Sequence, residues 1–278
     1  MARFWTRLGK ATTALYEDGC FAFAKGAAYS AVLAFFPILT TLAAILVQNN
    51  AESVARTVSR LLYDVVPPGT ETVVQGLFTV KGTRPPSLLV AAVILAAWAG
   101  SGVMMSLMEG FRTIYSIPSG RSFVKERLMA MLLVVAAAIP VLGASGLIVY
   151  GNQTQRTFLR WLRLYSGDGD LRGWVRFAGQ VVNFGLAAGA IILVLGLIYY
   201  FGPNRKQSLA QVMPGAALAT ALWLVSTLVI GWYIRYIANY NVLYGSVGAG
   251  LALLVWSYVL ALIALLGCEY NAVREQDF

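Results

Sequence analysis

Residues 207–268 read QSLAQVMPGAALATALWLVSTLVIGWYIRYIANYNVLYGSVGAGLALLVWSYVLALIALLGC and carry a single charged side chain, Arg235. A bilayer core about 30 Å thick is crossed by about 20 apolar residues in a helix. The stretch is therefore long enough for two passes through a membrane. The residues between the two passes, 238–246 (ANYNVLYGS), are polar and turn-forming but uncharged. This pattern predicts a helical hairpin in a bilayer.

The whole chain shares this composition. Of its 278 residues 59% are hydrophobic and 12% are charged, which is about half the charged fraction of an ordinary soluble domain. We predict an all-α, polytopic membrane protein with six transmembrane helices and short interfacial helices. The expected spans are 26–47, 87–108, 128–150, 178–201, 208–234 and 247–268. Residues 1–24 then form an N-terminal interfacial helix, 25–272 the transmembrane domain and 273–278 a short C-terminal tail.

The segments outside the spans give a few further expectations. Arg3–Phe23 mixes aromatic with charged residues, which predicts an amphipathic helix on the membrane surface, the alternative being a frayed polar terminus. The apolar run that follows is of spanning length, so we do not expect a cleavable signal. Two short interfacial helices are expected at 51–66 and 70–80, because apolar residues there recur with helical spacing.

The net charge of +9 has a plain explanation in a membrane protein. Lys and Arg in the loops set the topology and contact anionic lipid, so we expect membrane lipids and not nucleic acid as partners. A second copy of the chain or other envelope proteins are further candidate partners. On the side of the membrane where both termini are predicted to lie, the chain carries 11 basic residues, and on the opposite side it carries 10. The short loops are denser in Lys and Arg, so both termini are predicted to face the cytoplasm.

Polar side chains inside or beside a span are candidates for function, because they are costly there. Lys25 opens the first span, where snorkelling to headgroups is the alternative role. Glu109 and Arg112 lie one helical turn apart and either pair with each other or frame a cavity mouth. Asn183 suits interhelical hydrogen bonding or a ligand. Arg235 fits interface anchoring as well as a substrate site.

Catalytic chemistry has little support in this composition. The chain has no histidine, and its twelve acidic residues are scattered without a paired-carboxylate motif. The two cysteines are expected to be reduced and structural. We therefore expect no catalytic residue, no metal and no cofactor. The many glycines, among them the GxxxG pair Gly185 and Gly189, predict close helix packing.

Several short motifs in order resemble one bacterial family. They are Ala27-Ala28-Tyr29-Ser30 leading to Phe35-Phe36-Pro37, Phe201-Gly202-Pro203-Asn204-Arg205-Lys206, Pro214-Gly215-Ala216, Asn239-Tyr240-Asn241, Tyr244-Gly245-Ser246-Val247-Gly248 and Gly267-Cys268-Glu269-Tyr270-Asn271-Ala272. Together they are similar to the YihY/BrkB family of inner-membrane proteins over nearly the whole chain. The chain departs from the family pattern at Gly202 and Ser30.

The resemblance implies six helices, cytoplasmic termini and a bacterial inner membrane, but no settled activity. The family has been mislabelled as ribonuclease BN, a tRNA-processing enzyme, and also carries a virulence and serum-resistance label. Transport of lipids or lipid-linked envelope precursors is suggested for some relatives.

We expect a non-enzymatic transporter or flippase-like protein for lipid or another amphiphilic envelope component. The alternatives are a scaffold or envelope-integrity factor without transport and, less favoured, a tRNA-processing ribonuclease. The candidate substrate-binding or gating residues are Lys25, Tyr29, Pro37, Glu109, Arg112, Asn183, Arg235, Asn239, Tyr240, Asn241, Tyr244, Gly245, Glu269 and Asn271. In this reading the cations attract anionic headgroups, the amides and tyrosines hydrogen-bond them, and Pro37 with the glycines permits helix movement.

Overall fold

The structure, a computed structural model, describes residues 2–48, 86–118, 121–140, 173–236 and 246–276. Every regular element in these ranges is an α-helix, which confirms the predicted class for this part of the chain. The elements are α1 (Ala2–Glu17), α2 (Cys20–Gln48), α5 (Pro86–Ile114), a helix over residues 123–140, α7 (Gly173–Phe201), α8 (Leu209–Tyr236) and α10 (Ser246–Gln276).

Three helical segments in the described residues are long and apolar enough to cross a membrane. They are Val90–Ile114, Leu209–Val229 and Gly250–Gln276, and two shorter apolar helical segments are Cys20–Phe35 and Ala188–Phe201. Five of the six predicted spans lie within a described helix, apart from residue 208 just before α8, although the helices extend up to eight residues beyond the spans. The sixth, 128–150, is helical to residue 140 and lies outside the described residues beyond it. The structure thus supports three membrane-spanning helices, and a total of six stays a prediction.

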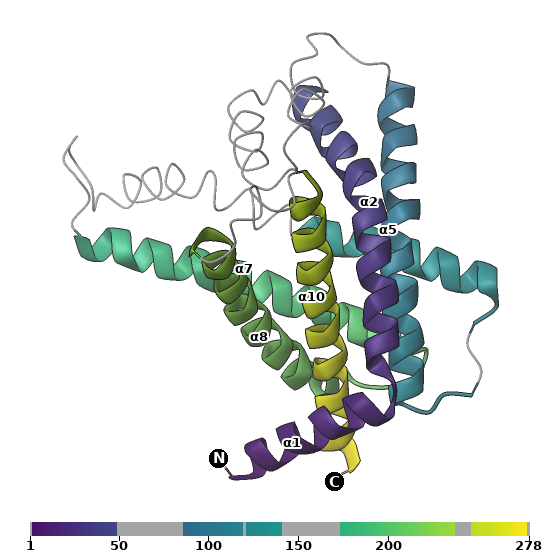
Figure 1. The fold of residues 1–278 in the computed structure, drawn as a ribbon, viewed down its shortest axis with the longest axis vertical. Helices are drawn as coiled ribbons and strands as arrows, with labels where there is room; N and C mark the ends of the chain where they lie inside the picture. Colours follow the sequence, from purple (N-terminus) through teal and green to yellow (C-terminus); the bar gives the residue numbers. More distant parts are fainter. Residues whose placement is uncertain (1, 49–85, 119–120, 141–172, 237–245, 277–278) are drawn as a thin grey trace.

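Helix α10 holds the bundle together. It packs against α8, α2, α1 and α5, while α2 lies along α5 and α7 packs on α8. Figure 1 shows α2, α5 and α10 running along the long axis, with α1 lying across the end of the bundle where α10 finishes. Ala11 of α1 packs there against Tyr270 and Val273 of α10. The N-terminal helix and the C-terminal end of the last helix therefore occupy one end of the molecule.

The turn between α1 and α2 is tight. Gly19 adopts a positive φ of 64°, a conformation that glycine takes without a steric cost. The Ala22 N–H donates to the Gly19 carbonyl at 2.9 Å, which starts α2 directly after the turn. This geometry brings Asp18 and Cys20 to the end of the bundle.

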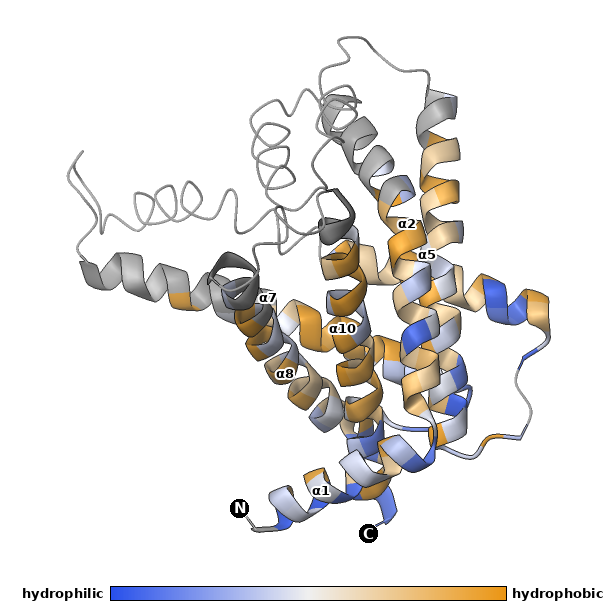
Figure 2. Ribbon diagram, in the orientation of Figure 1, coloured by the Kyte–Doolittle hydropathy of each residue, from blue (hydrophilic) through white to orange (hydrophobic). Residues whose placement is uncertain are grey.

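Polarity is divided along the bundle. Figure 2 shows hydrophilic residues gathered at the end where α1 and the last turns of α10 lie, and apolar residues along α8 and α10. Large apolar side chains point outward from the helices, among them Val90, Ile94 and Leu95 on α5 and Leu228 on α8. Outward apolar surface of this extent suits a lipid environment. We refer to the hydrophilic end as the polar end.

The expectation that glycines mark close helix packing is confirmed at one site and not at another. Gly102 lies against Ser30, whose hydroxyl would be 3.1 Å from an added Cβ, so close helix packing is confirmed there. At Gly185 and Gly189 an added Cβ would meet no described atom within 4 Å. The GxxxG pair therefore does not mark a close helix contact within the described part of the chain. A closer helix contact lies between Gly215 and Gly267.

Some expectations fall outside the described residues. They are the interfacial helices at 51–66 and 70–80, residues 141–150 of the third span and all but the last residue of the turn 238–246. The predicted N-terminal helix is shorter than expected: α1 ends at Glu17, because Gly19 forms a turn, and residues 20–24 belong to α2. The contact of α1 with a membrane surface stays a prediction. Pro37 stands inside α2, and the kink expected there stays a prediction as well.

Candidate functional site

Helices α8 and α10 cross at the polar end with almost no side chains between their backbones. A Cβ added at Gly215 would collide with the Gly267 carbonyl and with the Asn271 amide. A Cβ added at Gly267 would lie 2.7 Å from the Gly215 carbonyl and 2.8 Å from the Ala219 Cβ. Glycine is required at both positions because only a bare backbone permits this approach.

Asn271 joins the two helices at this crossing. Its Oδ1 accepts a hydrogen bond from the Gly215 N–H at 2.7 Å, and its Nδ2 donates to the Val212 carbonyl at 3.0 Å. The side chain is 1% exposed. Between its two partners stands Pro214, which lies inside α8. Proline has no N–H to donate, so it withdraws the intrahelical donor of the carbonyl one turn earlier, that of Ala210.

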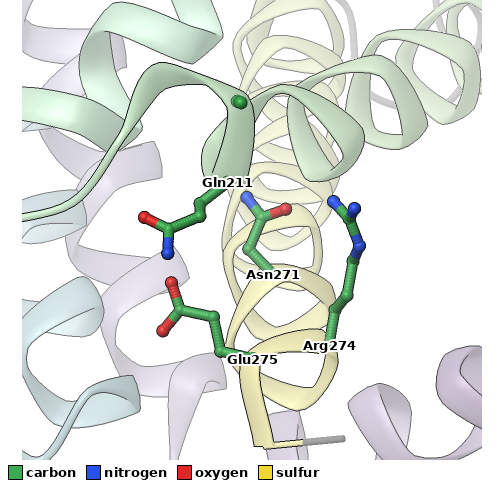
Figure 3. A pocket seen from close by; sticks show the side chains of 5 residues that line it. Gln211, Asn271, Arg274 and Glu275 are labelled. Carbon is green, nitrogen blue, oxygen red and sulfur yellow. The ribbon is translucent and has the colours of Figure 1, made fainter. Parts of the chain in front are cut away.

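A hollow of about 470 Å³ opens beside this crossing, lined by Ala210, Gln211, Asn271, Arg274 and Glu275. We call it the α8–α10 hollow. Figure 3 shows Gln211 and Glu275 pointing toward one another across it, with Arg274 on the other side of Asn271. The hollow is thus lined by a cation, a carboxylate and two amides, and by Ala210, whose carbonyl lacks its helical donor because of Pro214.

The connection from α7 to α8 lies at the polar end, where polar side chains bind the carbonyl groups at the end of α7. The Gln207 Nε2 donates to the Tyr199 carbonyl at 2.5 Å and to the Tyr200 carbonyl at 3.1 Å, so it caps the last turn of α7. Arg121 donates from Nη2 to the Phe201 carbonyl at 3.0 Å. Partial burial lowers the pKa of Arg121. These contacts satisfy carbonyls that have no partner within the helix.

Arg205 links this connection to α10 and α5. Its Nη2 lies 2.5 Å from the Glu275 Oε2, and its guanidinium stacks 4.1 Å from the centre of the Tyr115 ring. Burial is the main cause that raises the pKa of Tyr115 well above its usual value. The phenol therefore stays neutral beneath the guanidinium. Arg205 holds Glu275 in place at the edge of the α8–α10 hollow.

A second hollow, of about 670 Å³, lies where the α1–α2 turn meets the end of α5. We call it the α2–α5 hollow. Glu109 and Arg112 both line it, together with Asp18. Arg112 pairs with Glu126 at 2.7 Å. Pairing with each other was one of the two alternatives for Glu109 and Arg112. Arg112 pairs instead with Glu126, which the helix over residues 123–140 brings to it from outside α5.

Glu269 is held inside the bundle, close to this hollow. It is 2% exposed, and the Cys20 thiol donates to its Oε1 at 3.7 Å. Asp18 lies within hydrogen-bonding reach of the same carboxyl group. Both cysteines are free and buried, as predicted.

The structure thus gathers part of the predicted set at the polar end. Glu109, Arg112, Glu269 and Asn271 lie there, the first two lining the α2–α5 hollow and the fourth the α8–α10 hollow. Lys25 and Tyr29 are exposed on α2, outside both hollows. The side chains of Asn183 and Arg235 lie outside the described residues, as do Asn239, Tyr240, Asn241, Tyr244 and Gly245.

Several contributors to the two hollows were not singled out from the sequence, namely Asp18, Gln211, Arg274 and Glu275. One signal was available for the last two. Asn271, Arg274 and Glu275 stand at positions i, i+3 and i+4, so they share a face of one helix. Tyr199 was also missed, although it is fully enclosed and donates to the Ala264 carbonyl at 2.7 Å.

The helices and their outward apolar surface define an α-helical membrane protein. Residues 11–278 match the family described as virulence factor BrkB, and the chain belongs to that family. No solved structure matches the chain.

Curated relatives agree with this assignment. The ribonuclease-like protein YfkH of Bacillus subtilis is 30% identical over 193 residues, covering 69% of this chain and 68% of that protein. A UPF0761 membrane protein of Tolumonas auensis is 24% identical over 277 residues, covering 98% of this chain and 83% of the relative. One of Janthinobacterium sp. (strain Marseille) is 26% identical over 249 residues, covering 88% and 54%. The chain spans about half the length of this last relative.

Proposed function

We propose that this protein is a multi-pass inner-membrane transporter, flippase-like in action, for a lipid or another amphiphilic envelope component. The observation that carries the proposal is the α8–α10 hollow, a polar recess at one end of an otherwise apolar bundle. An amphiphile needs such a pairing, since its headgroup must leave water while its chains stay in hydrocarbon.

The groups around the hollow suit a phosphorylated headgroup. Arg274 supplies positive charge for a phosphate, and arginine is well suited to phosphate because its planar fork donates two parallel hydrogen bonds. Gln211 and the Ala210 carbonyl supply neutral hydrogen-bonding groups. Leu209 and Met213 are exposed on the first turns of α8, where they offer apolar surface for an acyl chain. The recess therefore supports recognition of both parts of an amphiphile.

The crossing of α8 and α10 also supports movement. Pro214 interrupts the hydrogen bonding of α8, and membrane helices tolerate such breaks where neighbouring groups satisfy the backbone. Here Asn271 binds the backbone on either side of Pro214, at the Gly215 N–H and the Val212 carbonyl, while Pro214 leaves the Ala210 carbonyl without its helical donor. One side chain therefore binds α8 on both sides of Pro214, so a displacement of Asn271 on α10 would move the first turns of α8.

The location and topology belong to the proposal. We place the protein in a bacterial inner membrane with both termini in the cytoplasm. The polar end then faces the cytoplasm, in keeping with the cations of α1, with Arg112 in the last turn of α5, and with Arg121, Arg205 and Lys206 in the short loops. Cysteine-accessibility mapping with Cys introduced at Lys206 tests this orientation directly.

An enzymatic role has less support. The tRNA-processing alternative would need an acid or base that reaches RNA, and Glu269, its best acidic candidate, is 2% exposed. The chain contains no histidine to act in its place. Purified protein that cleaves tRNA, with the cleavage lost in Glu269→Gln, would favour the enzyme over the transporter.

Reconstitution tests the proposed function. Full-length protein is placed in liposomes that contain lipids labelled on the headgroup, with phosphatidylglycerol and phosphatidylethanolamine as the first probes. Exchange between leaflets is followed by quenching from outside. We expect faster exchange than in empty liposomes, and slower exchange for Arg274→Gln than for the wild type. Exchange equal to that of empty liposomes across phospholipid and isoprenoid-phosphate probes would refute transport and favour a scaffold.

A further inference from the structure

Glu269 is a buried acidic side chain that the proposed headgroup site does not use. It lies on α10 with its carboxyl group directed toward the start of α2, where the Cys20 thiol is its hydrogen-bond donor at 3.7 Å. A thiol is a weak donor, and a distance of this length adds little. The residue is 2% exposed, so water does not replace the missing donors.

In the described part of the chain, the groups that act on Glu269 carry no positive charge. Those that act on it are Asp18 from the α1–α2 turn and Cys20 from α2, and its chain neighbour Cys268 completes the set. Two arginines at this end are engaged with other carboxylates, Arg112 of α5 with Glu126 and Arg205 with Glu275. An isolated buried carboxylate is costly, and such a group usually takes up a proton instead. When neutral, it can donate a hydrogen bond to a second carboxylate.

Asp18 is that second carboxylate, and it connects Glu269 to water. It lies within hydrogen-bonding reach of Glu269, and it also lines the α2–α5 hollow with Glu109 and Arg112. A buried carboxyl group beside a second carboxylate tends to hold a proton, because two like charges so close together are costly. A proton therefore has a path from the hollow to Asp18 and from Asp18 to Glu269.

The α1–α2 turn couples the proton on Glu269 to the packing of α1 on α10. Asp18 stands directly before Gly19, whose positive φ forms the turn, and α1 rests on α10 through Ala11 and Tyr270. With the proton present, Glu269 and Asp18 hold the turn against α10. Without it, two negative charges repel each other across that contact.

We propose that Glu269 and Asp18 form a proton-binding site that holds the α1–α2 turn on α10 when occupied and releases it when empty. The site lies apart from the α8–α10 hollow and does not depend on the proposed function. In a transporter it would make the proton the coupling ion.

Infrared difference spectroscopy of the full-length protein in lipid nanodiscs tests the site. A pH increase should remove the absorption of a protonated carboxyl group in the wild type. Glu269→Gln should abolish this signal, because glutamine has the shape of the neutral acid but no proton to lose. Glu109→Gln is the matched control, since Glu109 is an exposed carboxylate of the neighbouring hollow, and should leave the signal intact. Asp18→Asn should move the loss to lower pH, because it removes the charge that opposes ionisation.

Hydrogen exchange gives a second readout that does not need a spectral assignment. At a pH where the wild type has lost the carboxyl signal, α1 should exchange faster in the wild type than in Glu269→Gln at the same pH. An unchanged infrared signal in Glu269→Gln, or equal exchange of α1 in both proteins at every pH, would overturn the proposal. If Glu269→Gln does not fold, the direction of the shift in Asp18→Asn decides, and an absent or upward shift counts against the site.

Discussion

Asn271 of α10 accepts a hydrogen bond from the Gly215 N–H of α8 at 2.7 Å, one residue beyond the proline inside that helix. The same side chain donates to the Val212 carbonyl on the other side of Pro214. One amide thus spans the break in α8 and fixes where α10 crosses it. The α8–α10 hollow exists because this crossing holds the first turn of α8 beside the last turns of α10.

Replacing Asn271 by alanine should destabilise the bundle. The substitution removes two buried hydrogen bonds between the helices, each of which contributes about 0.5–1.5 kcal/mol. Thermal unfolding in detergent micelles measures the loss. Gln276→Ala, at an exposed position near the end of the same helix, should leave the unfolding temperature within error. Equal effects of the two substitutions would show that the bridge contributes nothing.

The two glycine sites should respond to alanine with opposite signs. At Gly215 the new methyl group collides with the Gly267 backbone, and overpacking of this kind costs about 1–3 kcal/mol. At Gly189 it meets no described atom within 4 Å, and alanine favours the helix by about 0.5–1 kcal/mol over glycine. Comparing the unfolding temperatures of both variants with the wild type checks the prediction. A destabilised Gly189→Ala would place a close helix contact at the GxxxG pair after all.

This contrast shows what local sequence can and cannot predict. Helix positions follow from uninterrupted apolar runs, so the predicted spans fall on helices where the structure describes them, although the ends of the helices were not predicted. The contact between Gly215 and Gly267 depends on two helices meeting across 52 residues, and no local spacing encodes which face turns inward. The GxxxG pair has the right spacing on a surface without a described neighbour. The Pro214-Gly215 and Gly267–Asn271 motifs were noticed for their family resemblance, and their mutual contact was not foreseen.

The charged residues also show that local spacing does not predict contacts between helices. Glu109 and Arg112 are one turn apart and suggested an ion pair, yet Arg112 pairs with Glu126. A helix from another part of the chain offers a carboxylate in better geometry than a neighbour on the same surface. Conversely, Glu269 and Asn271 were foreseen as polar residues at the exit of the last span, and both lie at the polar end, buried inside it.

A double-mutant cycle should identify the partner of Arg112. Arg112→Ala and Glu126→Ala should show a coupling energy of about 1 kcal/mol, typical of a pair that is only partly removed from water. Arg112→Ala and Glu109→Ala should show none within error. The unfolding free energies of the single and double variants in detergent provide both values, and coupling to Glu109 in place of Glu126 would contradict the structure.

Tyr199→Phe isolates one hydrogen bond in the core. The hydroxyl group donates to the Ala264 carbonyl at 2.7 Å, while the ring packs edge-on against Phe111 at 5.4 Å between centres. Phenylalanine keeps the ring contact and loses the bond, so the free energy of unfolding should fall by about 1 kcal/mol. Tyr16→Phe is the matched control, because the Tyr16 side chain is exposed on α1 and should tolerate the change. A fall of several kcal/mol in Tyr199→Phe would mean that the hydroxyl group has a further role.

Arg274→Gln should weaken binding of anionic lipid more than binding of zwitterionic lipid. Arg274 lines the α8–α10 hollow, and a basic residue near an anionic headgroup contributes about 1 kcal/mol, which corresponds to roughly a fivefold change in affinity. Lys206→Gln removes an exposed cation of the same polar end that does not line the hollow, so it controls for the net charge. Titration of nanodisc-embedded protein with short-chain phosphatidylglycerol and phosphatidylcholine measures both affinities. Equal losses in the two variants would mean that the whole polar end attracts anionic lipid through its charge, and that the α8–α10 hollow does not recognise the headgroup.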